Sequence, residues 1–308
     1  MHILVTGGAG FIGSNIADRL ISDGHSVVIV DNLFSGYMEN VNPAADFRNV
    51  DVTDFNALEE VFKEKRFDAV FHLAAQIDVR KSGKDPAFDA SVNIIGGINL
   101  LKLMEKYKSG KLIYSSTGGA IYGEPKSIIA DENQPAEPIA PYGVSKFCLE
   151  RYIEYFHRMC GIDYTIFRYA NVYGPRQDPL GEAGVIAIFM GKMIKGEGTV
   201  IFGNGKQTRD FVFIDDIVSA NIAALSQGSG EIINIGTGIE VSVNEIHSCL
   251  TEIFEIKEPA EIKPERKGEV FRIALDASKA KRILGWSPKF TLKEGLKITA
   301  DYMRRQES

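Results

Sequence analysis

Cysteine, long apolar runs and excess basic charge are all scarce in this sequence of 308 residues. Its three cysteines, Cys148, Cys160 and Cys249, have no CxxC spacing, which argues against a disulfide framework or a structural zinc site. No apolar stretch reaches the ~20 residues that cross a bilayer, and the first residues lack the pattern of a signal peptide. The five histidines show no metal-ligand spacing, so we expect no metal.

The charge balance points away from polyanionic partners. Lysine and arginine number 35 and aspartate and glutamate 41, which gives a formal net charge of −6. Such a protein has no general attraction to nucleic acids or anionic membranes. Hydrophobic residues make up 44% and charged residues 25%, as in ordinary globular proteins. We therefore expect a soluble, cytoplasmic protein that binds neither nucleic acid nor membrane.

The first half of the sequence alternates short apolar runs with helix-length amphipathic segments. The runs are rich in β-branched and aromatic residues, as expected for strands buried on both faces of a parallel sheet. Strand and helix in alternation predict an α/β fold with a doubly wound parallel sheet. The expected strands are 3–5, 27–30, 69–73, 112–114 and 164–167, and the expected helices are 11–22, 55–65, 86–107 and 142–159.

After about residue 170 the pattern loosens. A glycine- and proline-rich loop at 173–179 precedes a mixture of short elements, expected at 185–195, 200–202, 215–225, 232–235 and 243–254. We predict a nucleotide-binding domain over residues 1–170 and a smaller mixed α/β substrate-binding region over residues 171–308. Segments of the second region can return to the first sheet.

A glycine-rich loop lies between the first expected strand and the first expected helix. Gly8, Gly10 and Gly13 fit G-x-G-x-x-G, and Gly7, Gly10 and Gly13 fit a G-x-x-G-x-x-G variant. Such glycines let the backbone approach a pyrophosphate at the helix N-terminus, as in Rossmann dinucleotide sites. Asp31 ends the second strand 18 residues after Gly13. Its carboxylate can bind the adenosine ribose diol and would repel a 2′-phosphate, so the pattern favours NAD over NADP; the alternative is a tight turn without a ligand.

Further residues fit the same pocket. Phe11 and Ile12 complete the loop, Asp51 and Val52 follow the third strand, and the small residues of Leu73-Ala74-Ala75 end the fourth. Asn93 lies in a helical segment, where asparagine is not favoured, so it either hydrogen-bonds a loop or is a satisfied polar residue.

Tyr142 and Lys146 are four residues apart and share one face of an expected helix. A free phenol has a pKa near ~10, but a neighbouring cation favours the phenolate and lowers that pKa. The pair could then take a proton from a sugar hydroxyl while hydride leaves for NAD.

Six motifs together resemble the extended short-chain dehydrogenase/reductases. They are GGAGFIG, Asp31-Asn32, HLAA, the SST strand end, YGVSK and RYANVYGPRQ. Within that superfamily the whole chain is similar to the NAD-dependent UDP-glucose 4-epimerases. The resemblance implies that Tyr142 is the base, that Lys146 is its partner and a ribose ligand, and that Asn32, Ser115 and Tyr169 contact the cofactor.

The position of the third catalytic residue departs from the family pattern, because many relatives carry serine or threonine where this chain has Gly118. The role then falls to Thr117 or Ser116, and we favour Thr117. Related dehydratases carry adjacent acids at this place, which protonate the departing hydroxyl. This chain has Gly118, Gly119 and Ala120, so simple oxidation and re-reduction is expected instead.

The resemblance also places a nucleotide-sugar site in the second region. It implies that Asn171 meets the sugar diphosphate, that Arg209 and Arg266 bind phosphate oxygens, and that Glu269 holds the nucleoside ribose. Ile273 would line the sugar pocket and leave room for an acetamido group. The expected activity is UDP-glucose 4-epimerisation, with UDP-N-acetylglucosamine as a further substrate, in a homodimer. The alternatives are another nucleotide-sugar epimerase, a 4-keto-sugar reductase, or a dinucleotide-sensing regulator.

Overall fold

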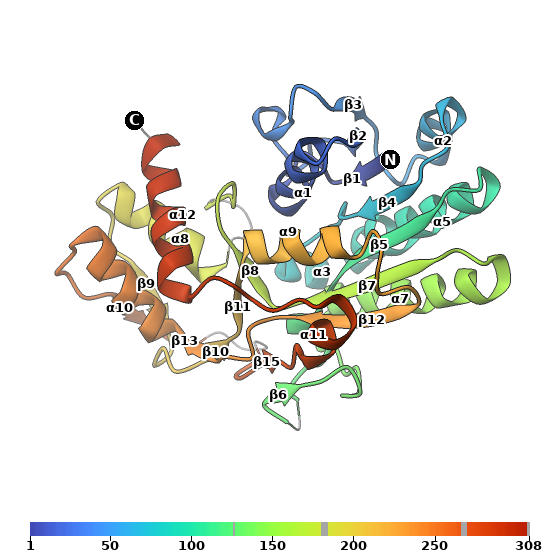
Figure 1. Ribbon diagram of the computed structural model, residues 1–308. Helices are drawn as coiled ribbons and strands as arrows, with labels where there is room; N and C mark the ends of the chain where they lie inside the picture. Colours follow the sequence, from blue (N-terminus) through green and yellow to red (C-terminus); the bar gives the residue numbers. More distant parts are fainter. Residues whose placement is uncertain (126, 180–183, 266–269, 307–308) are drawn as a thin grey trace.

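A seven-stranded parallel sheet forms the centre of the protein (Figure 1). The computed structural model describes residues 1–125, 127–179, 184–265 and 270–306. The strand order is β12-β7-β5-β4-β1-β2-β3, and every neighbouring pair is parallel. The doubly wound sheet predicted from the sequence is thereby confirmed. The strands are β1 His2–Thr6, β2 Ser26–Asp31, β3 Asp46–Asn49, β4 Ala69–His72, β5 Lys111–Thr117, β7 Tyr164–Tyr169 and β12 Glu231–Ile235.

Helices cover both faces of this sheet, as the strand composition predicts. Alternate residues of β1 point to opposite faces: Ile3 and Val5 pack in one hydrophobic cluster and Leu4 in the other. Helices α1 (Phe11–Ser22) and α9 (Ile214–Ala223) lie side by side against the first cluster (Figure 1). Helices α2 (Phe55–Glu64), α5 (Gly96–Lys106) and α7 (Pro141–Cys160) pack into the second.

The segment expected as one helix over residues 86–107 is interrupted. It consists of α4 (Pro86–Ala90), a π-helical turn at Ser91–Ile95, and α5; the short helix α3 (Val79–Lys84) precedes it. The widened turn lies where the Asn93 side chain turns inward, 2% exposed, to hydrogen-bond a neighbouring loop. Single π-helical turns of this kind are frequent at functional sites.

The C-terminal half supplies a second, smaller region and also completes the first. Strand β12 pairs with β7 in the central sheet, although it comes after residue 170. The second region holds helices and two-stranded sheets, in which β8 pairs with β11, β9 with β14, β10 with β13 and β6 with β15. Its elements are β8 Asn171–Tyr173, α8 Val185–Ile194, β9 Val200–Phe202, β10 Thr208–Arg209, β11 Phe211–Phe213, β13 Val241–Ser242, α10 Val243–Phe254, β14 Glu261–Lys263, β15 Ala274–Leu275 and α12 Leu292–Gln306, with α6 Gly118–Ile121 and β6 Ile129–Ala130 inserted between β5 and α7. Helix α11 (Ser278–Leu284) packs against β12 of the central sheet.

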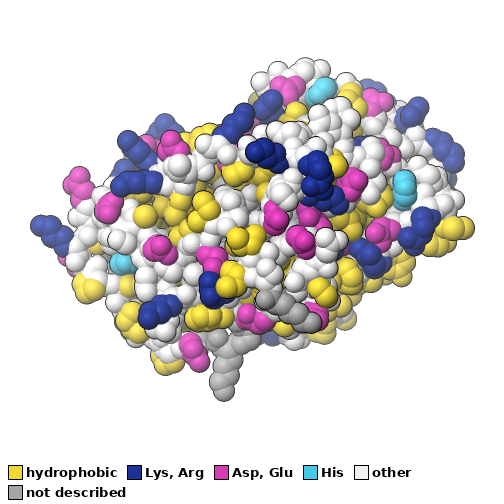
Figure 2. All heavy atoms as spheres, turned by 60° about the horizontal axis from the view of Figure 1, so that its bottom comes forward, with side chains coloured by type: hydrophobic (Ala, Val, Ile, Leu, Met, Phe, Trp, Pro, Cys, Tyr) yellow, Lys and Arg dark blue, Asp and Glu magenta, His cyan; other side chains and the backbone are white. Residues whose placement is uncertain are grey.

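The surface carries charges of both signs. Figure 2 shows basic and acidic side chains intermingled over one face of the molecule. Within the described residues, no helix is long and apolar enough to cross a membrane.

Candidate active site

A cavity of about 1470 Å³ lies at the carboxyl ends of the central strands. Residues that follow or end β1, β2, β4, β5 and β7 line it on one side, and α8, β9 and β11 line it on the other. Ligands of open α/β sheets bind at this edge. A site for one drug-sized ligand has about 300–1,000 Å³, so this cavity can hold two ligands together.

The glycine-rich loop forms one wall of the cavity, and only one of its two possible glycine patterns faces that cavity. Gly7, Gly10 and Gly13 line it, whereas Gly8 packs on β2, where a Cβ would lie 2.6 Å from the Ile29 side chain. Gly7 has a φ of +73°, and a Cβ there would lie 2.5 Å from the Ala74 backbone nitrogen. A Cβ on Gly13 would lie 2.1 Å from the Gly7 carbonyl oxygen. Only glycine fits at either position.

Helix α1 begins directly behind this loop. Its N-cap is Gly10, which has no side chain to satisfy the first backbone N–H groups, and the next residues, Phe11 and Ile12, line the cavity. Free N–H groups at a helix N-terminus form an anion site. The loop therefore fits a pyrophosphate in both shape and charge.

Asp31 lies at the end of β2 in the same cavity, 8% exposed. Its two oxygens accept backbone N–H groups from Ala9 at 3.0 Å and from Leu33 at 2.8 Å. Burial raises the pKa of Asp31, and these two hydrogen bonds oppose the rise. A carboxylate offers about four acceptor positions, so two remain for a diol. Nearby, Asn32 donates to Asp51 at 2.7 Å.

Most of the other predicted cofactor residues are brought together here. The cavity is lined by Asn32, Asp51, Val52, Leu73, Ala74, Ala75, Ser115 and Tyr169. Asn93 is not in the lining; it accepts from the Gln76 backbone N–H and donates to the Gln76 carbonyl, each at 2.9 Å. Gln76 itself lines the cavity. The structure therefore gives Asn93 a supporting role, which corresponds to the loop hydrogen bond predicted for it.

Tyr142 and Lys146 lie on the first turns of α7 and both line the cavity. Lys146 donates to the Ser115 carbonyl at 2.8 Å and is 3% exposed. Burial lowers the pKa of Lys146 to about 8, while the charges of Asp89 and Glu150 oppose the fall. Burial and then the Asp89 charge raise the pKa of Tyr142 well above that of a free phenol. This direction is opposite to the one predicted from the Tyr–Lys spacing, because desolvation of the phenolate outweighs the neighbouring cation.

The two candidates for the third catalytic residue have different surroundings. Ser116 borders the cavity but is 3% exposed, and its hydroxyl is already engaged, because it donates to the buried Glu150 at 2.6 Å. Thr117 ends β5 as the N-cap of α6, makes no side-chain capping bond, and lines the cavity. The geometry therefore favours Thr117 and gives Ser116 a structural hydrogen bond.

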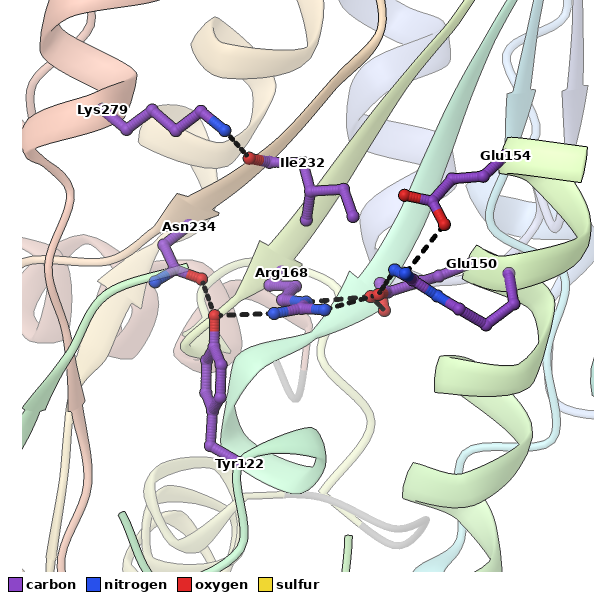
Figure 3. Close-up of polar contacts among 9 residues, drawn as sticks. Tyr122, Glu150, Glu154, Arg168, Ile232, Asn234 and Lys279 are labelled. Atoms are coloured by element: carbon purple, nitrogen blue, oxygen red, sulfur yellow. Dashed lines mark hydrogen bonds and ion pairs between the residues drawn. The ribbon is translucent and has the colours of Figure 1, made fainter. Parts of the chain in front are cut away.

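A buried polar network connects α7 with the neighbouring strands (Figure 3). Arg168 of β7 donates to both carboxylate oxygens of Glu150 on α7, at 3.0 and 2.6 Å. It also donates to the Tyr122 hydroxyl at 3.0 Å, which in turn donates to Asn234 at 2.8 Å. Glu150 is 0% and Arg168 4% exposed. Together with the Ser116–Glu150 hydrogen bond, the network connects α7 with β5, β7 and β12.

Of the residues predicted to bind the nucleotide sugar, some lie within the described part of the chain and some outside it. Asn171 and Arg209 line the cavity, on β8 and β10. Arg266 and Glu269 lie outside the described residues. Ile273 is 2% exposed within the hydrophobic core and does not line the cavity, whereas Val270 does. The structure therefore does not bring Ile273 to the cavity, since it precedes the buried strand β15 and packs inward with it.

Other lining residues were missed from the sequence. Loop 34–37, segment 76–81 and the apolar side of α8 all contribute. The loop follows Asp31-Asn32 directly, which is a usable signal, because a chain leaving the ribose-binding strand must pass the cofactor. Neither segment 76–81 nor α8 carries a comparable motif.

Comparisons with known proteins agree with this geometry. Residues 3–236 match the NAD dependent epimerase/dehydratase family. The chain is 50% identical to a Thermotoga maritima UDP-glucose 4-epimerase solved with UDP-glucose, with a TM-score of 0.99 over 100% of both chains. It is 40% identical to the Thermus thermophilus UDP-glucose 4-epimerase solved with NAD, with a TM-score of 0.94 over 99% of both chains. A UDP-glucose 4-epimerase from Mycolicibacterium smegmatis is 40% identical over 99% of both chains. The chain belongs to the NAD-dependent epimerase/dehydratase family.

Proposed function

We propose that this protein is a UDP-glucose 4-epimerase, an isomerase that interconverts UDP-glucose and UDP-galactose with NAD held throughout turnover. The observation that carries the proposal is a single cavity that joins the pyrophosphate loop, the Tyr142–Lys146 pair with Thr117, and the Asn171–Arg209 side. A dinucleotide and a nucleotide sugar can therefore lie in it with their reacting ends together. The full-length similarity to UDP-glucose 4-epimerases supports the same substrate.

The residues present fit a bound NAD. The glycine loop and the α1 N-terminus would hold its pyrophosphate, Asp31 its adenosine ribose, and Lys146 its second ribose. NAD supplies the hydride acceptor and donor at C4 of the sugar. The Asp31 carboxylate would repel the 2′-phosphate of NADP, so the site favours NAD.

The chain's own part in the chemistry is to move one proton and to orient the sugar. Tyr142 removes the proton of the C4 hydroxyl as the carbon is oxidised and returns it after the ketone has turned over. Thr117 donates a hydrogen bond to the reacting oxygen. The protonated Lys146 stabilises the phenolate, whose formation burial otherwise opposes. Asn171 and Arg209 hold the diphosphate.

Elimination and net reduction are less well supported. A dehydratase needs an acid beside the base, and this chain has Gly118, Gly119 and Ala120 at the strand end. A 4-keto-sugar reductase must exchange its cofactor at every turnover, which would show as a requirement for added NADH or NADPH. The argument for N-acetylated sugars from Ile273 loses its basis, because that residue is buried outside the cavity.

A homodimer is supported by an apolar stripe on α7. Val144, Tyr152, Tyr155 and Met159 are 50%, 40%, 49% and 67% exposed, and the last three follow helical spacing along one side. Light scattering should give twice the 33.9 kDa chain mass. Tyr155→Asp should shift the protein to monomer; a monomeric wild type would contradict the proposal.

The activity itself is tested by incubating the purified protein with UDP-galactose and no added cofactor. Chromatography should show UDP-glucose accumulating to a constant ratio, and the same ratio should be reached from UDP-glucose. Tyr142→Phe, which removes the ionisable oxygen and little volume, should abolish turnover while UDP still binds. A wild type that needs added NADH, or a fully active Tyr142→Phe, would overturn the assignment.

A further inference from the structure

A second buried carboxylate lies beside the catalytic pair. Asp89, on α4, is 0% exposed. It accepts three hydrogen bonds, from Gln76 at 2.9 Å, from Asn93 at 3.1 Å and from the Ser145 hydroxyl at 2.5 Å. All three donors are neutral side chains. Three donors around one carboxylate are the arrangement expected for a charge that is buried and kept.

The three donors connect Asp89 to both halves of the site. Ser145 lies between Tyr142 and Lys146 on the first turns of α7. Gln76 belongs to the segment that lines the cofactor cavity, and Asn93 hydrogen-bonds the Gln76 backbone on both sides. A displacement of the Asp89 side chain would therefore move α7 relative to segment 76–81, which lines the cavity.

Asp89 differs from the other buried acid near Lys146. The charge of Glu150 is matched by Arg168, whose guanidinium lies 2.6 Å away. Among the ion pairs of the described residues, none involves Asp89 at that range. The nearby positive group on which its field acts is Lys146.

We propose that Asp89 is a positioning residue of the proposed epimerase. Its carboxylate holds Ser145, and with it the Tyr142–Lys146 turn, against the Gln76 segment. Its negative charge also favours the protonated form of Lys146, which is buried on the same helical turn as Ser145. The proposal rests on the proposed function for its catalytic meaning, but the charge relation between Asp89 and Lys146 can be measured without turnover.

The direction of the electrostatic effect follows from the surroundings. Asp89 raises the pKa of Lys146 against burial, and it also raises the pKa of Tyr142. The other groups that face Lys146 are Glu150 of α7, matched by Arg168, the Tyr114 ring of β5 at 5.0 Å, and His72 of β4. Burial and Lys146 lower the pKa of His72 to about 3, so it stays neutral. Removing the Asp89 charge should therefore lower the pKa of Lys146 and of Tyr142 together.

The test is the pH profile of kcat/KM for UDP-galactose in Asp89→Asn. The limb at which Lys146 loses its proton should move to lower pH by about one unit. A merely structural residue would lower the height of the profile and leave this limb in place. Asp85→Asn is the matched control. Asp85 caps the same helix by accepting from the Phe88 N–H at 2.9 Å, is exposed, and should leave the limb unchanged.

A second measurement does not depend on activity. Competitive acetylation of the purified holoprotein, read by peptide mass spectrometry, gives the pKa of Lys146 directly. It should fall by about one unit in Asp89→Asn and stay at the wild-type value in Asp89→Glu, which keeps the charge. Asp89→Ser replaces the amide variant if the latter does not fold. An unmoved limb, or an unchanged Lys146 pKa, would overturn the proposal. An inactive wild type with the predicted Lys146 shift would instead reject only the proposed function.

Discussion

Breaking the Glu150–Arg168 pair should cost more stability than any surface ion pair of this protein. Glu150→Gln keeps the shape of the side chain but removes its charge, leaving the Arg168 guanidinium, 4% exposed, without a counter-ion. The two hydrogen bonds that Glu150 accepts from Arg168 and the one that it accepts from Ser116 are weakened together. Removing one partner of a buried pair costs about 3–5 kcal/mol.

That magnitude sets the expected change in melting temperature. At about 2.1 cal/mol/K per residue, the unfolding entropy of a chain of 308 residues is roughly 0.65 kcal/mol/K. A loss of 3–5 kcal/mol then lowers Tm by about 5–8 °C, measurable by calorimetry. The matched control is Glu154→Gln, on the same helix. Its partner Arg151 lies 2.8 Å away and is 46% exposed, so the cost should stay within about 0.5 kcal/mol.

A double substitution separates the burial of charge from the loss of packing. Glu150→Leu with Arg168→Met removes both charges, so it should be more stable than either single variant. Equal Tm losses for Glu150→Gln and Glu154→Gln would refute the reasoning, as would a double variant whose loss is the sum of the two single ones.

Three further substitutions test the site. Thr117→Val should lower kcat by the equivalent of about 1–3 kcal/mol, whereas Ser116→Ala should lower Tm and leave kcat close to wild type; the reverse order would show that Ser116 is the catalytic hydroxyl. Gly13→Ala places a Cβ 2.1 Å from the Gly7 carbonyl oxygen, so the purified protein should lose its bound NAD, measured after denaturation; full NAD content would contradict the loop geometry. Asp31→Ser should let NADP reconstitute the apoprotein, and wild type that accepts NADP equally well would refute the role of the carboxylate.

The sheet and the phosphate loop could be predicted because their signals are local. The runs at 3–5 and 27–30 are apolar throughout and fall within β1 and β2, as strands buried on both faces require. The glycines fit two registers in sequence, and only the approach of the Ala74 and Gly7 backbones selects Gly7, Gly10 and Gly13. That approach involves a residue 67 positions away, which no local pattern contains.

The pKa values of the site residues could not be predicted from the sequence, because they depend on which groups the fold buries. The spacing of Tyr142 and Lys146 predicts their shared helix face but not the desolvation that raises the pKa of Tyr142. Asp89 and Glu150 look like ordinary helix acids in sequence, and only the fold shows that they are 0% exposed and that their charges oppose the fall in the pKa of Lys146. The prediction that Ile273 lines the sugar pocket is wrong for the same reason, since a count along the chain does not show which way a side chain packs.

The central claim is that the hydride removed from C4 returns to the same sugar from a cofactor that never leaves. The most direct measurement uses UDP-galactose carrying deuterium at C4, incubated with the enzyme and an excess of unlabelled NADH. The account predicts UDP-glucose that keeps the deuterium at C4, as seen by mass spectrometry and NMR. Loss of the label to the NADH pool would contradict it, because the cofactor would then exchange during turnover and the enzyme would act as a net oxidoreductase.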